Sequence, residues 1–222
     1  MEIPDYYLVR PQGAAVADLV AFDRLYTDQI EPGGGRRIDY RLTAPRWQFL
    51  CWLAETKDVL LHGSGNPDVR EFEPRRPADT SEFGGRNAVF AASDGIWATF
   101  FAVVDRAVAT SLVNMSVVVG HEGAERSLYY FSVNHDALVR GAWHSGTVYV
   151  LPAETFERQP DTAREGVPVR SNQWASAQPV RPLAALPVTP ADFPFLADVN
   201  GHDQPTVAAR AARDPDAFPW RE

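Results

Sequence analysis

The chain has 222 residues, of which 45% are hydrophobic, and it carries a formal net charge of −8 with one cysteine. This hydrophobic content is enough for a sizeable core, which excludes disorder throughout the chain. The acidic balance argues against binding extended nucleic acids or anionic membranes, and the single cysteine excludes an intrachain disulfide and a thiolate zinc cluster.

Two amphipathic helices are predicted first. Residues 16–30 place apolar side chains at helical spacing, and the run from Pro32 to Gly35 ends this helix. A second helix is predicted over residues 46–57, where Cys51 lies among apolar and aromatic neighbours. Cys51 is therefore expected to be a buried core thiol and not a nucleophile.

The pattern then changes to strands. Residues 59–63 read as a buried strand that a glycine stops, and residues 63–87 read as a long ordered loop. A strand over 87–92 follows, and Asp94 is expected to cap an apolar helix over 96–104. Further strands are predicted at 111–119, 128–133, 147–151, 173–176 and 184–188, with loops through the 140s to 170s. The tail after Gly201 is predicted to be a surface helix or a frayed end.

No signal for export or for membrane insertion is visible. The first five residues lack a basic and an apolar region, and no apolar run approaches the roughly 18 residues of a spanning helix. We therefore expect a cytoplasmic protein with no membrane partner.

Several common catalytic motifs are also missing. The chain has no glycine-rich dinucleotide fingerprint, phosphate-binding loop, zinc-protease helix or nucleophile elbow. Its histidines are too widely spaced for a local metal site, so no metal is expected.

The tripeptide His62-Gly63-Ser64 at the end of the strand over 59–63 is the first candidate site. A glycine there lets a ligand approach the main chain, and the imidazole can bond a ligand hydroxyl. Taken alone, the tripeptide is more simply a strand cap followed by a turn. The segment Val89-Phe90-Ala91 and the aromatic helix after it add a possible wall for a flat ring, and Gln173-Trp174 begins a third segment.

In this order of motifs the chain resembles the ADP-ribosyltransferase superfamily, nearest its His-Tyr-Glu branch of poly(ADP-ribose) polymerases and diphtheria-type toxins. His62-Gly63-Ser64 matches the first motif, Phe90 stands in the place of the tyrosine, and Gln173 stands in the place of the glutamate. The resemblance implies that His62 bonds a ribose hydroxyl, that the Gly63 main chain holds the nicotinamide carboxamide, and that Phe100 or Phe101 forms the second wall of the nicotinamide slot. Ser64 and Ser93 complete the NAD-binding set that it implies.

The resemblance also implies a fold. We expect an α+β protein with a split antiparallel β-sheet core over residues 59–200. An N-terminal helical region over 1–58 would pack on this core as a cap, and residues 201–222 would form a C-terminal tail, all in one compact domain.

The departures from the motifs bear on the reaction. Gln173 keeps a hydrogen bond but lacks the charge that stabilises an oxocarbenium-like state, and it cannot act as a general base. Single ADP-ribose transfer or NAD hydrolysis is then favoured over chain elongation. A loop carboxylate could supply the missing charge; the candidates are Glu154, Glu157, Asp161 and Glu165.

Three hypotheses follow. The first is a mono-ADP-ribosyltransferase or NAD glycohydrolase that uses NAD as substrate and an acceptor that the sequence does not identify. The second is a catalytically inactive module of the same fold that binds NAD, ADP-ribose or another nucleotide. The third is an unrelated domain in which the tripeptide is only a turn. Arginines of the long loop could meet the NAD pyrophosphate, although an exposed, solvated role is expected for each; they are Arg70, Arg75, Arg76 and Arg86.

Overall fold

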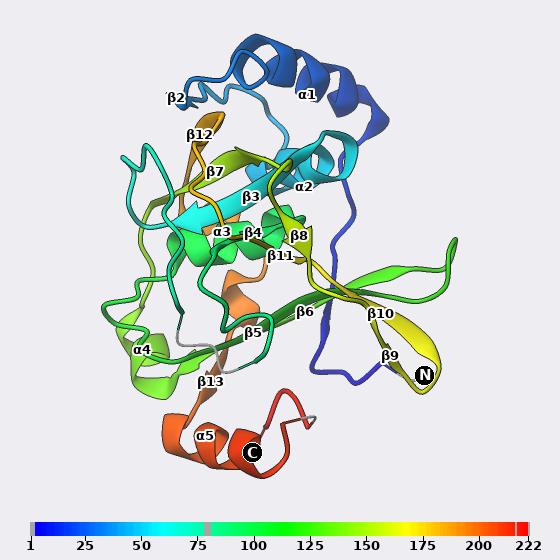
Figure 1. The fold of residues 1–222 in the computed structure, drawn as a ribbon, viewed down its shortest axis with the longest axis vertical. Helices are drawn as coiled ribbons and strands as arrows, with labels where there is room; N and C mark the ends of the chain where they lie inside the picture. The colour runs from blue at the N-terminus through cyan, green and yellow to red at the C-terminus, as the bar shows by residue number, and fades with distance from the viewer. Residues whose placement is uncertain (1–2, 78–80, 216, 222) are drawn as a thin grey trace.

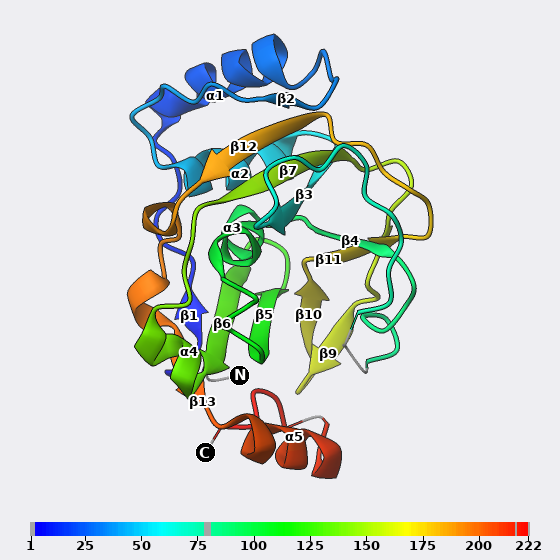
Figure 2. The ribbon, with the colours of Figure 1, turned by 90° about the vertical axis from the view of Figure 1, so that its left-hand side faces the viewer.

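The computed structural model of the protein describes residues 3–77, 81–215 and 217–221. It has an α+β fold in which two mainly antiparallel sheets enclose a central helix (Figures 1 and 2). This confirms the α+β class. In the described part of the chain, no helix is both long and apolar enough to cross a bilayer.

The β5–β6 sheet has the order β1-β6-β5-β10-β9, and β13 pairs with β6 in parallel. Its strands are β1 (Leu8–Val9), β5 (Leu112–Val119), β6 (Arg126–Asn134), β9 (Thr162–Arg164), β10 (Val167–Ser171) and β13 (Asn200–His202).

The β3–β4 sheet has the order β2-β12-β7-β3-β4-β11-β8, and only β2 and β12 pair in parallel. Its strands are β2 (Arg36–Arg37), β3 (Val59–Ser64), β4 (Val89–Ala92), β7 (Gly146–Pro152), β8 (Glu157–Arg158), β11 (Gln173–Ser176) and β12 (Ala184–Val188).

The helices are α1 (Val16–Gln29), α2 (Arg46–Thr56), α3 (Gly95–Val103), α4 (His135–Arg140) and α5 (Gln204–Arg213), with short 3-10 turns at Pro190–Asp192 and Leu196–Asp198. Figure 2 shows α3 between the two sheets. Every residue of α3 except Phe101 is buried, as expected for a helix that is apolar on all sides. Asp94 caps its first turn by accepting a hydrogen bond from the Trp97 N–H at 2.7 Å, which confirms the predicted cap.

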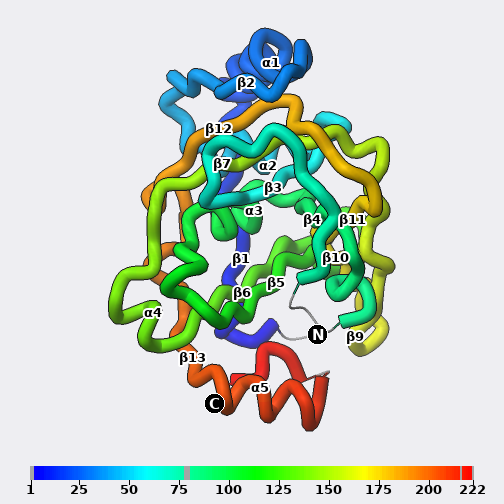
Figure 3. The backbone as a smooth tube through the Cα atoms, turned by 60° about the vertical axis from the view of Figure 1, so that its left-hand side comes forward, coloured from blue at the N-terminus to red at the C-terminus, as the bar shows by residue number. Residues whose placement is uncertain are grey.

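The two N-terminal helices differ in burial. On α2, five of the eleven residues are buried, Cys51 among them at 1% exposure, and they join one core cluster with α3 and β3. Helix α1 buries only Phe22 and Leu25 and lies at the outer end of the molecule (Figures 1 and 3). Cys51 is therefore a core thiol, as predicted.

The segment between β3 and β4 is the expected long loop, of which residues 78–80 lie outside the described part of the chain. Isolated bridges join its Phe72 to Val180 and its Arg75 to Ala88, the residue directly before β4. The C-terminal tail forms a surface helix, α5, which Asp203 caps and which packs through the buried Val207.

Candidate functional site

The three segments that carry the sequence motifs are neighbouring strands. In the β3–β4 sheet, β4 lies between β3 and β11; Ala92 pairs with Leu61 on one side and with Gln173 on the other. Phe90 pairs with Ala175 of β11. Chain-distant motifs are thus brought side by side by strand pairing.

His62 lies at the point where β3 and β4 separate. The two strands pair only at Leu61 and Ala92, whereas His62, Gly63 and Ser64 continue to pair with β7. The His62 Nδ1 atom lies 2.6 Å from the Phe90 carbonyl oxygen, and because a carbonyl can only accept, Nδ1 is the protonated nitrogen. The ring also contacts Phe72 of the long loop, with 4.4 Å between ring centroids. Nε2 is left as the acceptor nitrogen.

The motif side chains do not all point to one face of the sheet. Phe90 and Gln173 share the face of Ala92, which packs in the central core with Leu61. Since side chains alternate along a strand, His62 points to the other face, where it meets Phe72. His62 therefore reaches Phe90 through its main-chain carbonyl at the gap between β3 and β4.

Gly63 is held against the central helix. A Cβ atom at this position would lie 2.0 Å from the Ala98 carbonyl oxygen and 2.6 Å from the Ala102 nitrogen, both of α3. We predicted that the glycine would let a ligand approach closely. On the face where a side chain would point, the close neighbour is the main chain of α3 instead.

The two candidate aromatic walls differ. Phe100 is fully buried and packs against Phe131 with ring centroids 4.7 Å apart, so it is a core residue and cannot form the wall of an open slot. Phe101 is half-buried and contacts Trp97. Of the two, Phe101 is therefore the one that can still face a ligand.

The two candidate serines have local partners. The Ser64 hydroxyl accepts a hydrogen bond from the Asn66 N–H at 3.1 Å. The Ser93 hydroxyl bonds the Asn172 side chain at 3.3 Å, and the Ser93 N–H donates to the Asn172 carbonyl. Ser93 thus ties the end of β4 to the residue before Gln173.

Among the four candidate loop carboxylates, strand pairing brings Glu157 next to the motif strands. Glu157 pairs with Ala175 across β8 and β11, so it shares the face of Phe90 and Gln173. Its carboxylate bonds Arg86 at 3.2 Å and is 78% exposed. Asp161 pairs instead with Arg158, and Glu154 and Glu165 are exposed.

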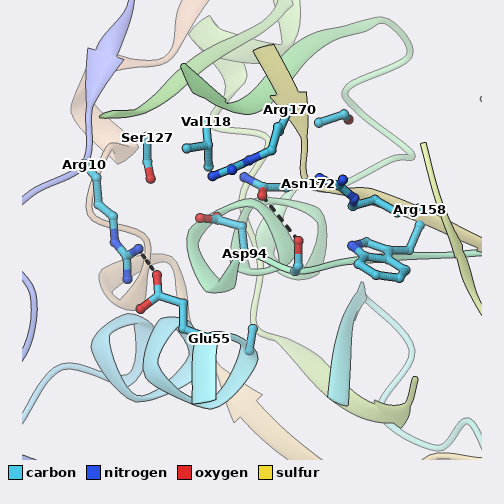
Figure 4. Close-up of a pocket in the computed structure, with 12 residues that line it drawn as sticks. Arg10, Glu55, Asp94, Val118, Ser127, Arg158, Arg170 and Asn172 are labelled. Carbon is cyan, nitrogen blue, oxygen red and sulfur yellow. Dashed lines mark hydrogen bonds and ion pairs between the residues drawn. The ribbon is translucent and has the colours of Figure 1, made fainter. Parts of the chain in front are cut away.

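A cavity lies elsewhere, at the crossing from β10 to β11, where the chain passes from one sheet to the other (Figure 4). It has a volume of about 370 Å³. Ser93 is the one predicted site residue among its lining residues, and the cavity is not lined by His62, Phe90 or Gln173. The lining residues are Arg10, Ala54, Glu55, Ser93, Asp94, Val118, Ser127, Arg158, Arg170, Ser171, Asn172 and Trp174.

The buried acid of this cavity is Asp94, which is 4% exposed. Its two carboxylate oxygens accept hydrogen bonds from the Trp97 N–H and the Tyr129 hydroxyl, both at 2.7 Å. Burial raises the pKa of Asp94 and that of Tyr129. Because both oxygens already have partners, Asp94 is a structural cap that borders the cavity.

Sequence reasoning missed the arginines of this cavity. We predicted pyrophosphate contacts from Arg70, Arg75, Arg76 and Arg86, none of which lines it. Arg10, Arg158 and Arg170 come from distant segments with no local motif around them. No sequence signal could have grouped them, because they meet only where the two sheets come together: Arg158 belongs to the β3–β4 sheet and Arg170 to the β5–β6 sheet.

The partial burial of His62 predicts a pH-dependent stability. Burial lowers the pKa of His62 and outweighs the hydrogen bond to Phe90, which acts in the opposite direction. The unfolded chain then binds a proton that the folded protein does not, so stability falls as the pH decreases below about 6.5. Between about pH 7.5 and about pH 5.5, wild-type protein should lose more unfolding free energy than His62→Gln. Equal losses in denaturant titrations of both proteins would show that folded His62 titrates normally.

Comparison with known proteins gives no relative: no protein-family model, no curated protein and no solved structure matches the chain significantly.

Proposed function

We propose that the protein is an ADP-ribosyltransferase-like enzyme that cleaves NAD, releases nicotinamide and passes ADP-ribose singly to an acceptor or to water. The observation that carries the proposal is the strand order β3-β4-β11, which sets His62-Gly63-Ser64, Phe90 and Gln173 on three adjacent strands. The contact between His62 Nδ1 and the Phe90 carbonyl supports it further, because it fixes the imidazole at the gap where β3 and β4 separate.

In this proposal His62 holds the substrate by a hydrogen bond at the gap between β3 and β4. The substrate passes through this gap to reach Phe90 and Gln173, because these two side chains lie on the opposite face of the sheet from the His62 ring. With Nδ1 donating to Phe90, Nε2 can accept a hydrogen bond from a ribose hydroxyl of NAD. The lowered pKa keeps the ring neutral, which suits an acceptor. The half-buried rings of Phe90 and Phe101 offer stacking faces for nicotinamide.

The reaction breaks the bond between nicotinamide and C1′ of its ribose, and nicotinamide leaves with the electron pair. The positive charge that develops at C1′ is stabilised by a nearby carboxylate. Gln173 orients the ribose by hydrogen bonding, and Glu157 on the same face of the sheet supplies the negative charge. Water or an acceptor then adds at C1′ and loses a proton.

A binding module that does not cleave NAD is the second candidate. It is favoured by the amide at Gln173, where the resemblance would place a carboxylate, and by the close packing of Gly63 on α3. NAD or ADP-ribose binding without nicotinamide release would identify this function.

The test is nicotinamide release from NAD by the purified protein, followed by chromatography. His62→Ala should lower kcat/KM by about 100-fold because it removes the hydrogen bond that positions the ribose. The matched control is His121→Ala, an exposed histidine in the turn between β5 and β6, which should retain the wild-type rate.

Gln173→Glu provides a second readout. It adds a carboxylate where the resemblance places one and should raise the rate of release. If neither wild-type protein nor this variant binds any nicotinamide or adenine nucleotide, the proposal is wrong.

A further inference from the structure

The cavity at the β10–β11 crossing gathers three arginines in an acidic chain. Arg10 follows β1, Arg158 belongs to β8 and Arg170 belongs to β10. Figure 4 shows the three on different sides of the same space. Guanidinium groups suit phosphate oxygens because each offers five N–H donors in a planar fork.

Acidic partners offset the charge of the three arginines but do not use all of their N–H donors. Glu55 pairs with Arg10, and Asp94 has both oxygens occupied by Trp97 and Tyr129. The remaining arginine partners lie outside the cavity lining: Asp161 for Arg158 at 3.0 Å and Glu125 for Arg170 at 2.7 Å. Each of these ion pairs leaves further N–H groups free to bond a ligand.

Trp174 provides an independent indication that the cavity binds a ligand with hydrogen-bond acceptors. It lines the cavity, and its indole N–H is buried without a hydrogen-bond partner among the described residues. An indole N–H can only donate, and buried donors in folded proteins are normally paired. A ligand rich in acceptor oxygens would satisfy it.

From these contacts we propose that this cavity binds the phosphate groups of a nucleotide-sized ligand. Its volume of about 370 Å³ lies in the usual range of small-molecule pockets, about 300 to 1,000 Å³. The inference rests on the cavity alone and does not depend on the proposed NAD chemistry. The phosphates could belong to NAD itself or to a separate phosphorylated acceptor.

The experiment is calorimetric titration of the full chain with inorganic pyrophosphate at low ionic strength. Wild-type protein should bind, and Arg170→Gln should weaken binding about tenfold because it removes charge-assisted hydrogen bonds. Trp174→Phe should also weaken binding, since it keeps an aromatic ring but removes the N–H donor. Added salt should lower the affinity.

The matched control is Arg24→Gln. Arg24 also forms an ion pair, with Asp28 at 3.7 Å, but it lies on α1 and its side chain is 84% exposed. This variant should bind pyrophosphate as wild type does, and circular dichroism should show all variants folded. Absence of binding, or equal binding by Arg170→Gln and Arg24→Gln, overturns the inference.

A competition arm separates the two sources of phosphate. If NAD or ADP-ribose displaces pyrophosphate, the cavity holds the phosphates of the dinucleotide. If both bind together, the cavity is a subsite for a phosphorylated acceptor. Nicotinamide release is measured in parallel, so absent pyrophosphate binding with intact release refutes this inference and leaves the proposed function standing.

Discussion

Replacing Gly63 with alanine is expected to destabilise the protein by about 3 kcal/mol. The added methyl group would stand 2.0 Å from the Ala98 carbonyl oxygen and 2.6 Å from the Ala102 nitrogen. These are main-chain atoms of a buried helix between two sheets, so no flexible side chain can move to relieve the overlap. Either α3 or β3 must shift, and both belong to the central core cluster.

Gly13→Ala is the matched control for this substitution. Gly13 is exposed, and a Cβ atom built there meets nothing within 4 Å. Its unfolding free energy should change by no more than about 0.5 kcal/mol. The measurement is denaturant unfolding of wild type and both variants, with the midpoint and the slope compared.

The same variants distinguish between two roles of Gly63: close packing against α3 and close approach of a ligand to the main chain. If it serves helix packing, Gly63→Ala loses stability with or without NAD present. Wild-type stability combined with lost NAD binding would instead mean that the glycine serves ligand approach and that the close packing on α3 is wrong.

The long, strongly patterned elements could be predicted from the sequence. Helices α1, α2 and α3 and the strands β3, β4, β7, β11 and β12 lie within one or two residues of their predicted bounds. Each contains enough apolar residues at helical or strand spacing to indicate both its secondary structure and that it packs in the core. The cap of α3 was predictable because an aspartate stands directly before the apolar run.

The short elements could not be predicted. Strands β1, β2 and β8 have two residues each, and β10 contains Pro168, so their local sequences carry no strand signal. They form because a longer strand already offers a hydrogen-bonding edge. β8 pairs with β11 in this way, and it brings Glu157 beside the motif strands.

The site was predictable only in its order along the chain. The three motif segments form the adjacent strands β3, β4 and β11. The direction of the His62 side chain, however, depends on where β3 and β4 separate. Likewise, the choice of Phe101 over Phe100 depends on which side of α3 is buried against Phe131 and Phe193. Both properties belong to tertiary packing.

Glu157→Gln is expected to lower nicotinamide release by about 100-fold if Glu157 provides the charge that Gln173 lacks. The substitution keeps size and hydrogen bonding and removes only the negative charge. NAD affinity should change little, because the charge acts mainly as positive charge develops at C1′. The exposed ion pair with Arg86 contributes little, so the unfolding free energy should stay within about 0.5 kcal/mol of wild type.

Two further variants make this expectation specific to the position. Glu154→Gln removes an exposed carboxylate of the same segment and should leave the rate unchanged. The double variant Glu157→Gln, Gln173→Glu returns one negative charge to the same face of the sheet, one strand away, and should recover part of the lost rate. The measurement is the single-turnover rate of nicotinamide release, determined for Glu157→Gln, Glu154→Gln and the double variant. A wild-type rate in Glu157→Gln would show that the negative charge comes from another residue.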